Sequence, residues 1–97
     1  MRIYFSEQDV VDACSVYLAH HHHRRPEDVQ VDLQADEIRG FSAEAKVGFR
    51  TVLMTEQEMI DGIALYLSEY HGFNPRELRI DLQFEDGQGI GAQIMVD

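Results

Sequence analysis

Ser6-Glu7-Gln8-Asp9 and Thr55-Glu56-Gln57-Glu58 are two copies of one helix start, 49 positions apart in a chain of 97 residues, and the architecture follows from them. In each copy a hydroxyl residue is followed three positions later by an acid, which is the capping-box pattern of a helix N-terminus. The match continues without a gap to the end of the chain. It includes the pairs Asp12 and Asp61, Tyr17 and Tyr66, His22 and His71, Pro26 and Pro75, Leu33 and Leu82, Gly40 and Gly89, and Val47 and Val96.

This repetition indicates a doubled structural unit that folds as one domain. Half of the chain is too short to bury a stable core alone, so the two halves are expected to share one core. Segments 1–48 and 50–97 are therefore predicted to be related by a pseudo-two-fold axis within a single domain, residues 1–97. Each half is predicted to contain a strand, a helix and two further strands.

Two amphipathic helices are predicted, from about residue 7 to 22 and from about 56 to 71. Apolar residues recur at spacings of three and four along each segment, which places them on one face of the helix. The acids in the first turns suit the positive end of each helix dipole. Glutamine and aspartate lie one turn apart on the opposite face and are predicted to form hydrogen bonds: Gln8 with Asp12, and Gln57 with Asp61.

Alternation of apolar and polar residues predicts strands that face the core on one side and solvent on the other. The predicted strands span residues 2–5, 28–35, 41–54, 77–84 and 90–96. The fold class is thus α+β, with two helices packed on one face of a mainly antiparallel sheet, and a ferredoxin-like variant is the nearest common strand order. Residues 41–54 are predicted to form one long strand with a bulge or bend at Gly48, where the apolar alternation changes phase.

The composition bears on the partners of the protein. Asp and Glu number 18 against 8 Lys and Arg, which gives a formal net charge of −10. This charge repels the phosphates of nucleic acids and anionic membrane surfaces, so we expect neither as a partner. No apolar run is long enough to cross a bilayer, and the N-terminus lacks a signal-peptide pattern. Cys14 is the only cysteine and lies at an apolar helix position, which favours a buried thiol in the reducing cytoplasm.

Four consecutive histidines, His20 to His23, end the first helix, and neutral imidazole is a common ligand of zinc and nickel. Their spacing alone does not build a tetrahedral site, since only His20 and His23 are three positions apart. A pseudo-two-fold axis would bring in the histidine of the second half, so the candidate metal ligands are His20, His22, His23 and His71. The alternative explanation is structural, because histidines suit the negative end of a helix dipole.

Asp32 and Asp81 are the candidate catalytic pair, because equivalent strands place them on the polar face of the predicted sheet. Two carboxylates that approach each other across the pseudo-axis would shift each other's pKa values, as acid–base catalysis requires. The neighbouring glutamines and arginine indicate instead an exposed sheet surface. We therefore expect no enzyme activity and no cofactor, since the chain has no phosphate-binding glycine loop that opens a helix.

Three stretches carry a family likeness: Arg2-Ile3-Tyr4-Phe5-Ser6-Glu7-Gln8-Asp9, Pro26-Glu27-Asp28-Val29 and Gly40-Phe41-Ser42-Ala43-Glu44. In them the chain resembles the YxcD-like family of small bacterial proteins of unknown function, and the likeness covers essentially the whole chain. The resemblance implies a small cytoplasmic protein. It brings no activity, ligand or catalytic residue with it.

The first functional hypothesis is a non-enzymatic module that binds itself as a homodimer or binds another protein. It rests on the half-polar sheet and on the edge strands that a small open sheet leaves free. The alternative is a weak metal-binding or metal-sensing protein that uses the run from His20 to His23. A second alternative is a small enzyme that uses Asp32 and Asp81.

Overall fold

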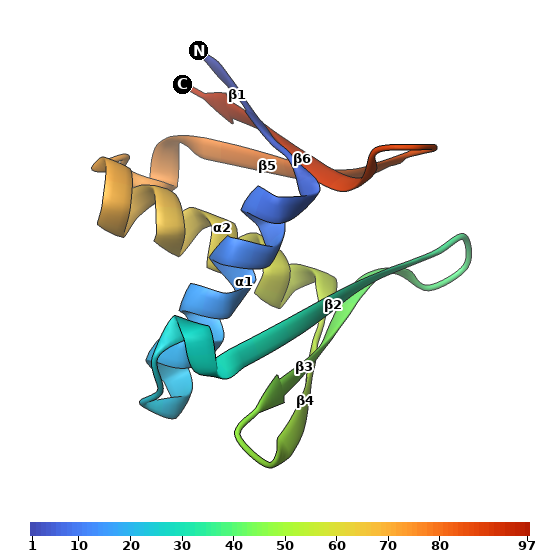
Figure 1. Ribbon diagram of the computed structural model, residues 1–97. Coiled ribbons are helices and arrows are strands. Elements are labelled where there is room, and N and C mark those ends of the chain that lie inside the picture. The colour runs from blue at the N-terminus through green and yellow to red at the C-terminus, as the bar shows by residue number, and fades with distance from the viewer.

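The computed structural model describes residues 1–97, which form two helices, two short 3-10 helices and six strands (Figure 1). In chain order the elements are β1 (Arg2–Phe5), α1 (Glu7–His22), η1 (Pro26–Asp28), β2 (Val29–Asp36), β3 (Gly40–Val47), β4 (Arg50–Met54), α2 (Glu56–His71), η2 (Pro75–Glu77), β5 (Leu78–Glu85) and β6 (Gly89–Val96). The helices lie between two sheets, and the two ends of the chain lie side by side (Figure 1). No helix is long and apolar enough to cross a membrane.

Both helices begin with the predicted capping box. The hydroxyl of Ser6 accepts a hydrogen bond from the Asp9 amide, and the Asp9 carboxylate accepts one from the Ser6 amide. Thr55 and Glu58 repeat this exchange at the start of α2. The predicted glutamine–aspartate hydrogen bonds also form, at 2.8 Å in α1 and 2.9 Å in α2. The helix boundaries predicted from sequence are confirmed.

The two helices end in the same conformation although their end residues differ. Gly72 after α2 and His23 after α1 both adopt the left-handed conformation, with φ values of 71° and 54°. Glycine adopts this conformation without steric conflict, whereas a β-carbon makes it less favourable by about 1–2 kcal/mol. The end of α1 therefore carries a local strain that the end of α2 does not.

Each sheet combines strands from both halves of the chain. One sheet has the order β1-β6-β5 and the other has the order β2-β3-β4, and all neighbours are antiparallel. The registers agree with the repeat. Ile3 pairs with Ile94 in the first sheet, and their repeat equivalents, Val52 and Ala45, pair in the second. The first strand of each half thus completes the sheet of the other half.

The predicted long strand over residues 41–54 is wrong. This segment divides into β3 and β4, which pair through a two-residue turn, Gly48-Phe49, flanked by Val47 and Arg50. Gly48 has a φ of 63°, which glycine tolerates at the first position of a type II′ turn. The change of apolar phase at Gly48 comes from this reversal of the chain and not from a bulge.

The predicted α+β class, with two helices packed against antiparallel sheets, is confirmed. The strands form two sheets of three, whereas the sequence predicted one sheet. The ferredoxin-like order is not the one found, because that order places all strands in a single sheet. The tight turn at Gly48 is the cause, since it returns β4 along β3 and keeps it out of the sheet that holds β5 and β6.

One apolar core joins residues of both helices and both sheets. Its largest fully buried side chains are Val10, Cys14, Met54, Met59, Ile63 and Ile94. The helices approach each other closely where Gly62 of α2 meets Ala13 of α1, which is its equivalent in the repeat. A β-carbon on Gly62 would lie 3.1 Å from the β-carbon of Tyr17. The absence of a side chain at Gly62 therefore permits the close crossing of the helices.

Cys14 lies in this core and is fully buried. Burial raises the pKa of its thiol from 9.0 to about 12, because the thiolate would lose its hydration. The thiol of the folded protein consequently stays neutral, and thus weakly nucleophilic, at neutral pH.

We expect the wild-type protein to lose stability relative to a Cys14→Ala variant as the pH rises above about 9. Above that pH the thiol of the unfolded chain ionises while the folded thiol does not, so ionisation favours unfolding. Below it the thiol is neutral in both states and contributes no pH dependence. The free energy of unfolding should fall by up to ~1.4 kcal/mol per pH unit from this group. Urea unfolding of both proteins over this range measures the difference, and parallel pH profiles would contradict the prediction.

Candidate functional site

Asp32 and Asp81, the candidate catalytic pair, lie on two different sheets. Asp32 on β2 is opposite Glu44 of β3, and Asp81 on β5 is opposite Gln93 of β6. Both aspartates are exposed. The predicted approach of the two carboxylates is wrong, because β2 and β5 are equivalent in the repeat but belong to separate sheets.

The histidine run forms the last turn of α1 and its C-terminal cap. All side chains from His20 to His23 are exposed or half-buried. The His21 ring lies against Tyr17, with 4.2 Å between ring centroids, and His71 lies 5.7 Å from the ring centroid of Tyr66. No three His, Cys, Asp or Glu side chains gather in a group that would hold a metal ion. The structure therefore places His21 and His71 beside tyrosines near the helix ends.

Metal binding by His20, His22, His23 and His71 stays a prediction, and calorimetry tests it. Zinc is titrated into chelator-treated protein, and saturable binding at micromolar concentrations that His22→Ala and His71→Ala both weaken would support the site. His21→Ala is the matched control, since His21 lies in the same run but outside the predicted set. An absence of saturable binding would contradict the prediction.

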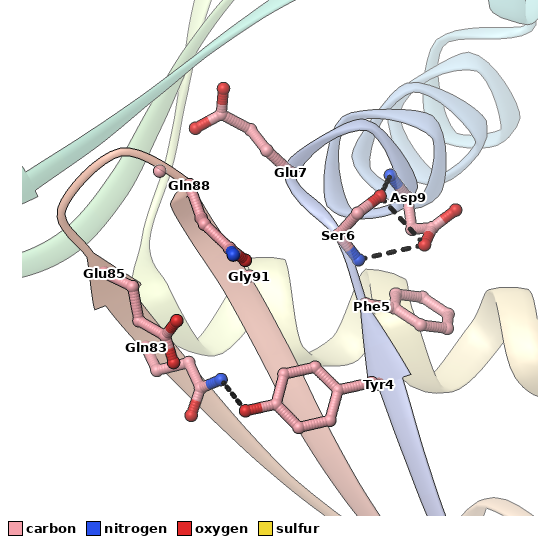
Figure 2. Close-up of a pocket in the computed structure, with 10 residues that line it drawn as sticks. Tyr4, Phe5, Ser6, Glu7, Asp9, Gln83, Glu85, Gln88 and Gly91 are labelled. Atoms are coloured by element: carbon pink, nitrogen blue, oxygen red, sulfur yellow. Dashed lines mark hydrogen bonds between the residues drawn. The ribbon is translucent and has the colours of Figure 1, made fainter.

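A hollow of about 260 Å³ opens where β1 ends and α1 begins (Figure 2). On its sheet side the hydroxyl of Tyr4 accepts a hydrogen bond from Gln83 at 2.8 Å. Three carboxylates line the hollow, those of Glu7, Asp9 and Glu85. The first two already accept hydrogen bonds from backbone amides. The Glu7 and Asp9 carboxylates therefore stabilise the local fold. Of the three acids, Glu85 is the one whose carboxylate is left to contact a ligand.

Glu7 ties the start of α1 to β6, and Glu56 ties the start of α2 to β3. The Glu7 carboxylate accepts a hydrogen bond from the Ile90 amide at 2.9 Å, and the Glu56 carboxylate accepts one from the Phe41 amide at 3.0 Å. β1 pairs with β6 as far as Ala92, and β4 pairs with β3 as far as Ala43. The Ile90 and Phe41 amides lie two residues past these points, where no edge strand remains to accept their hydrogen bonds. The carboxylate therefore replaces the missing strand partner. A β-carbon at Gly89, where φ is positive, would overlap the Glu7 carboxylate.

We expect Glu7→Ala to lower the free energy of unfolding by about 1 kcal/mol, because the part-buried Ile90 amide loses its acceptor. Glu7→Gln is the matched control, since its side-chain carbonyl keeps an acceptor at the same position. Urea unfolding of the two variants measures the difference. Equal stability of Glu7→Ala and the wild type, or equal losses in both variants, would be the contrary result.

β1 and β4 are outer strands of their sheets and carry exposed apolar side chains. On β4 the Leu53 side chain is 71% exposed, and Phe49 in the preceding turn is fully exposed. The equivalent of Leu53 on β1 is Tyr4, which is 61% exposed. Large apolar side chains on an open edge strand are typical of a surface that contacts another protein.

The β3–β4 hairpin is also a basic region on an acidic protein. Lys46 and Arg50 lie on its strands, and the Arg24 guanidinium lies 3.1 Å from where a β-carbon on Gly48 would be. None of these three cations forms an ion pair, since the ion pairs of the chain involve Arg25 alone. Three of the 8 basic residues thus gather at one hairpin, which will attract acidic groups.

The sequence-based interpretation missed this hairpin because it merged β3 and β4 into one strand. A usable signal exists in the glycine of Gly48-Phe49, since a glycine-first pair between two apolar runs is typical of a two-residue hairpin turn. Recognition of that turn would have shown Phe49 at its tip and β4 at the edge of a sheet.

The fold and its open edges define a small α+β protein built from two exchanged β-α-β-β units. Residues 1–87 match the family described as protein of unknown function DUF2653, and the chain belongs to this family. No curated protein and no solved structure matches the chain. The family description names no activity, ligand or partner, so function has to be argued from the surface.

Proposed function

We propose that this protein is a non-enzymatic interaction module that binds a second copy of itself or another protein. The observation that carries the proposal is the open edge of the β2-β3-β4 sheet, where Leu53 and Phe49 are exposed. An unpaired edge strand offers backbone N–H and C=O groups to a further strand, and exposed apolar side chains add contact area. The edge therefore supplies both the specificity and the affinity of a strand-addition contact.

We also propose that the protein is related to the YxcD-like proteins and that it is located in the cytoplasm. Membership of a family of unknown function is compatible with the resemblance to the YxcD-like proteins. A cytoplasmic location is supported by the single buried cysteine, which is kept as a free thiol. In the cytoplasm such a module would bind its partner through non-covalent contacts and not through disulfides.

Sedimentation equilibrium at increasing concentration, together with affinity capture from cell lysate, tests the proposal. We expect self-association at micromolar concentrations or a captured partner, and we expect Leu53→Lys to weaken whichever occurs. Ile38→Lys is the matched control, because Ile38 is 94% exposed but lies in the β2–β3 turn and not on an edge strand. A monomer at high micromolar concentration that captures no protein would contradict the proposal.

A further inference from the structure

β4 presents its unpaired backbone groups at Thr51 and Leu53. In a two-residue hairpin the residues that flank the turn are hydrogen bonded to each other, and bonded positions then alternate along the strand. Because Val47 and Arg50 flank the turn, the even-numbered residues of β4 bond to β3. The N–H and C=O groups of the odd-numbered residues, Thr51 and Leu53, therefore point away from the sheet.

This edge is complementary to itself. When two copies of β4 lie antiparallel about a two-fold axis through Val52, Thr51 of each copy is opposite Leu53 of the other. Both residues have outward backbone groups, so the two pairs form N–H···O=C bonds in both directions. The two Val52 residues face each other on the axis as a non-hydrogen-bonded pair, with α-carbons about 4.5 Å apart. The pairing turns two open sheets into one continuous sheet.

The charges at this edge favour a second copy as the partner. Arg50 of one copy would be opposite Met54 of the other, next to the first turn of its α2. Glu56 and Glu58 supply negative charge there, although their carboxylates also accept hydrogen bonds from backbone amides of their own chain. Arg50 has no ion-pair partner in its own chain, and the pairing brings acidic groups to it. This contact occurs twice, once on each side of the axis. It offsets part of the repulsion between two acidic chains.

β1, the repeat equivalent of β4, is less suited to such a contact. Its outward positions are Arg2 and Tyr4, where β4 has Thr51 and Leu53. A charged side chain such as Arg2 on an edge strand is a common device against strand pairing. The Tyr4 hydroxyl is already bonded to Gln83 across its own sheet. The outward positions of β4, Thr51 and Leu53, have neither feature, although the repeat makes the two strands otherwise alike.

We infer that β4 is a dimerisation surface, on which two copies of this chain pair antiparallel through Arg50–Met54 with Val52 on the axis. The inference rests on the proposed function and specifies its partner as a second copy. Paired edge strands bury less than the ~1,600 Å² of a standard interface, and we expect the dimer to form at micromolar concentrations. Leu53 becomes less exposed in the pair, because Thr51 of the second copy lies opposite it, and this explains an apolar residue at this position.

Disulfide cross-linking tests the register. In a Val52→Cys variant the two thiols face each other on the axis, within the range of about 4.4–6.8 Å between α-carbons that a disulfide spans. Ile3→Cys is the matched control, because Ile3 is the half-buried equivalent on β1. Under mild oxidation we expect Val52→Cys to form a covalent dimer about tenfold faster than Ile3→Cys. The buried Cys14 adds no background while the protein stays folded.

Sedimentation equilibrium of two lysine variants tests the surface. Leu53→Lys places one added charge from each copy at the junction, and we expect it to weaken the dimer about tenfold or more. Tyr4→Lys makes the same kind of change at the equivalent position of β1 and should leave the dimer intact. Circular dichroism shows that both variants are folded before the comparison is made.

The outcomes separate this inference from the proposed function. Preferential cross-linking of Val52→Cys together with dissociation of Leu53→Lys supports the β4 dimer. A wild-type dimer that Leu53→Lys leaves intact, or equal cross-linking of the two cysteine variants, overturns the β4 assignment but leaves an interaction module. A wild-type monomer at high micromolar concentration overturns the β4 dimer in every case. If affinity capture from lysate then recovers a different protein, the proposed function is retained. If it recovers no protein, the proposed function is overturned as well.

Discussion

Residues 1–48 and 50–97 are each expected to be unfolded when they are produced as separate chains. In the intact protein β1 pairs only with β6, and β4 pairs only with β3, so each isolated half contains one strand without a partner. The core is divided as well, because α1 packs on β6 and α2 packs on β3. A chain of this length does not bury enough apolar surface to fold without its other half.

Circular dichroism and NMR of each half at low micromolar concentration measure this effect. Mixing the two halves is expected to restore the native spectrum, because β1 can again pair with β6, and β4 with β3, between the two chains. The matched control is a circular permutant that starts at Phe49 and joins residue 97 to residue 1 through a short glycine linker. Its new connection is short, since the Met1 amino group donates a hydrogen bond to the Val96 carbonyl at 3.1 Å. A folded monomeric half, or an unfolded permutant, would contradict the prediction.

Gly62→Val is expected to lower the free energy of unfolding by about 3 kcal/mol, because it overfills the helix crossing. Its β-carbon alone would lie 3.1 Å from the Tyr17 β-carbon and 3.6 Å from the Ala13 carbonyl oxygen. These atoms belong to the α1 backbone or are attached directly to it, so relief requires the helices to move apart. Such a movement opens the core between both sheets.

Chemical unfolding of Gly62→Val measures the loss. Glu69→Val is the matched control on the same helix, where the side chain is exposed. The control is expected to change stability by no more than about 0.5–1 kcal/mol, which covers the lower helix propensity of valine. Stability losses of equal size in the two variants would show that steric contact at the crossing is not the cause.

The candidate site was less predictable than the fold. Sequence reasoning identified exposed polar sheet faces and free edges in general, but it could not say which strand would be an edge. Asp32 and Asp81 illustrate the difficulty, because they lie at corresponding positions of β2 and β5 but on different sheets. Leu53 is apolar, and apolar alternation along a single long strand would place it on the face that it shares with Val47. Its exposure follows from strand pairing, which a local pattern does not contain.

The local elements of this protein are specified by residues that are close together in the sequence. The two capping boxes, the helices at residues 7–22 and 56–71, and the alternation along β2 and β5 depend on residues within about four positions of one another. Short-range hydrogen bonds and helix or strand periodicity suffice to specify such features. The burial of Cys14 followed from the same periodicity.

The pairing of the strands, in contrast, became evident only in the folded molecule. The two halves have the same apolar pattern, so the periodicity of the residues does not distinguish β3 from β6 as the partner of β1. The length of one connection removes this ambiguity. The two-residue turn Gly48-Phe49 brings β4 directly back along β3, which occupies that edge and leaves β6 as the partner of β1. The exchange of strands thus follows from chain connectivity and steric exclusion, neither of which is contained in residue periodicity.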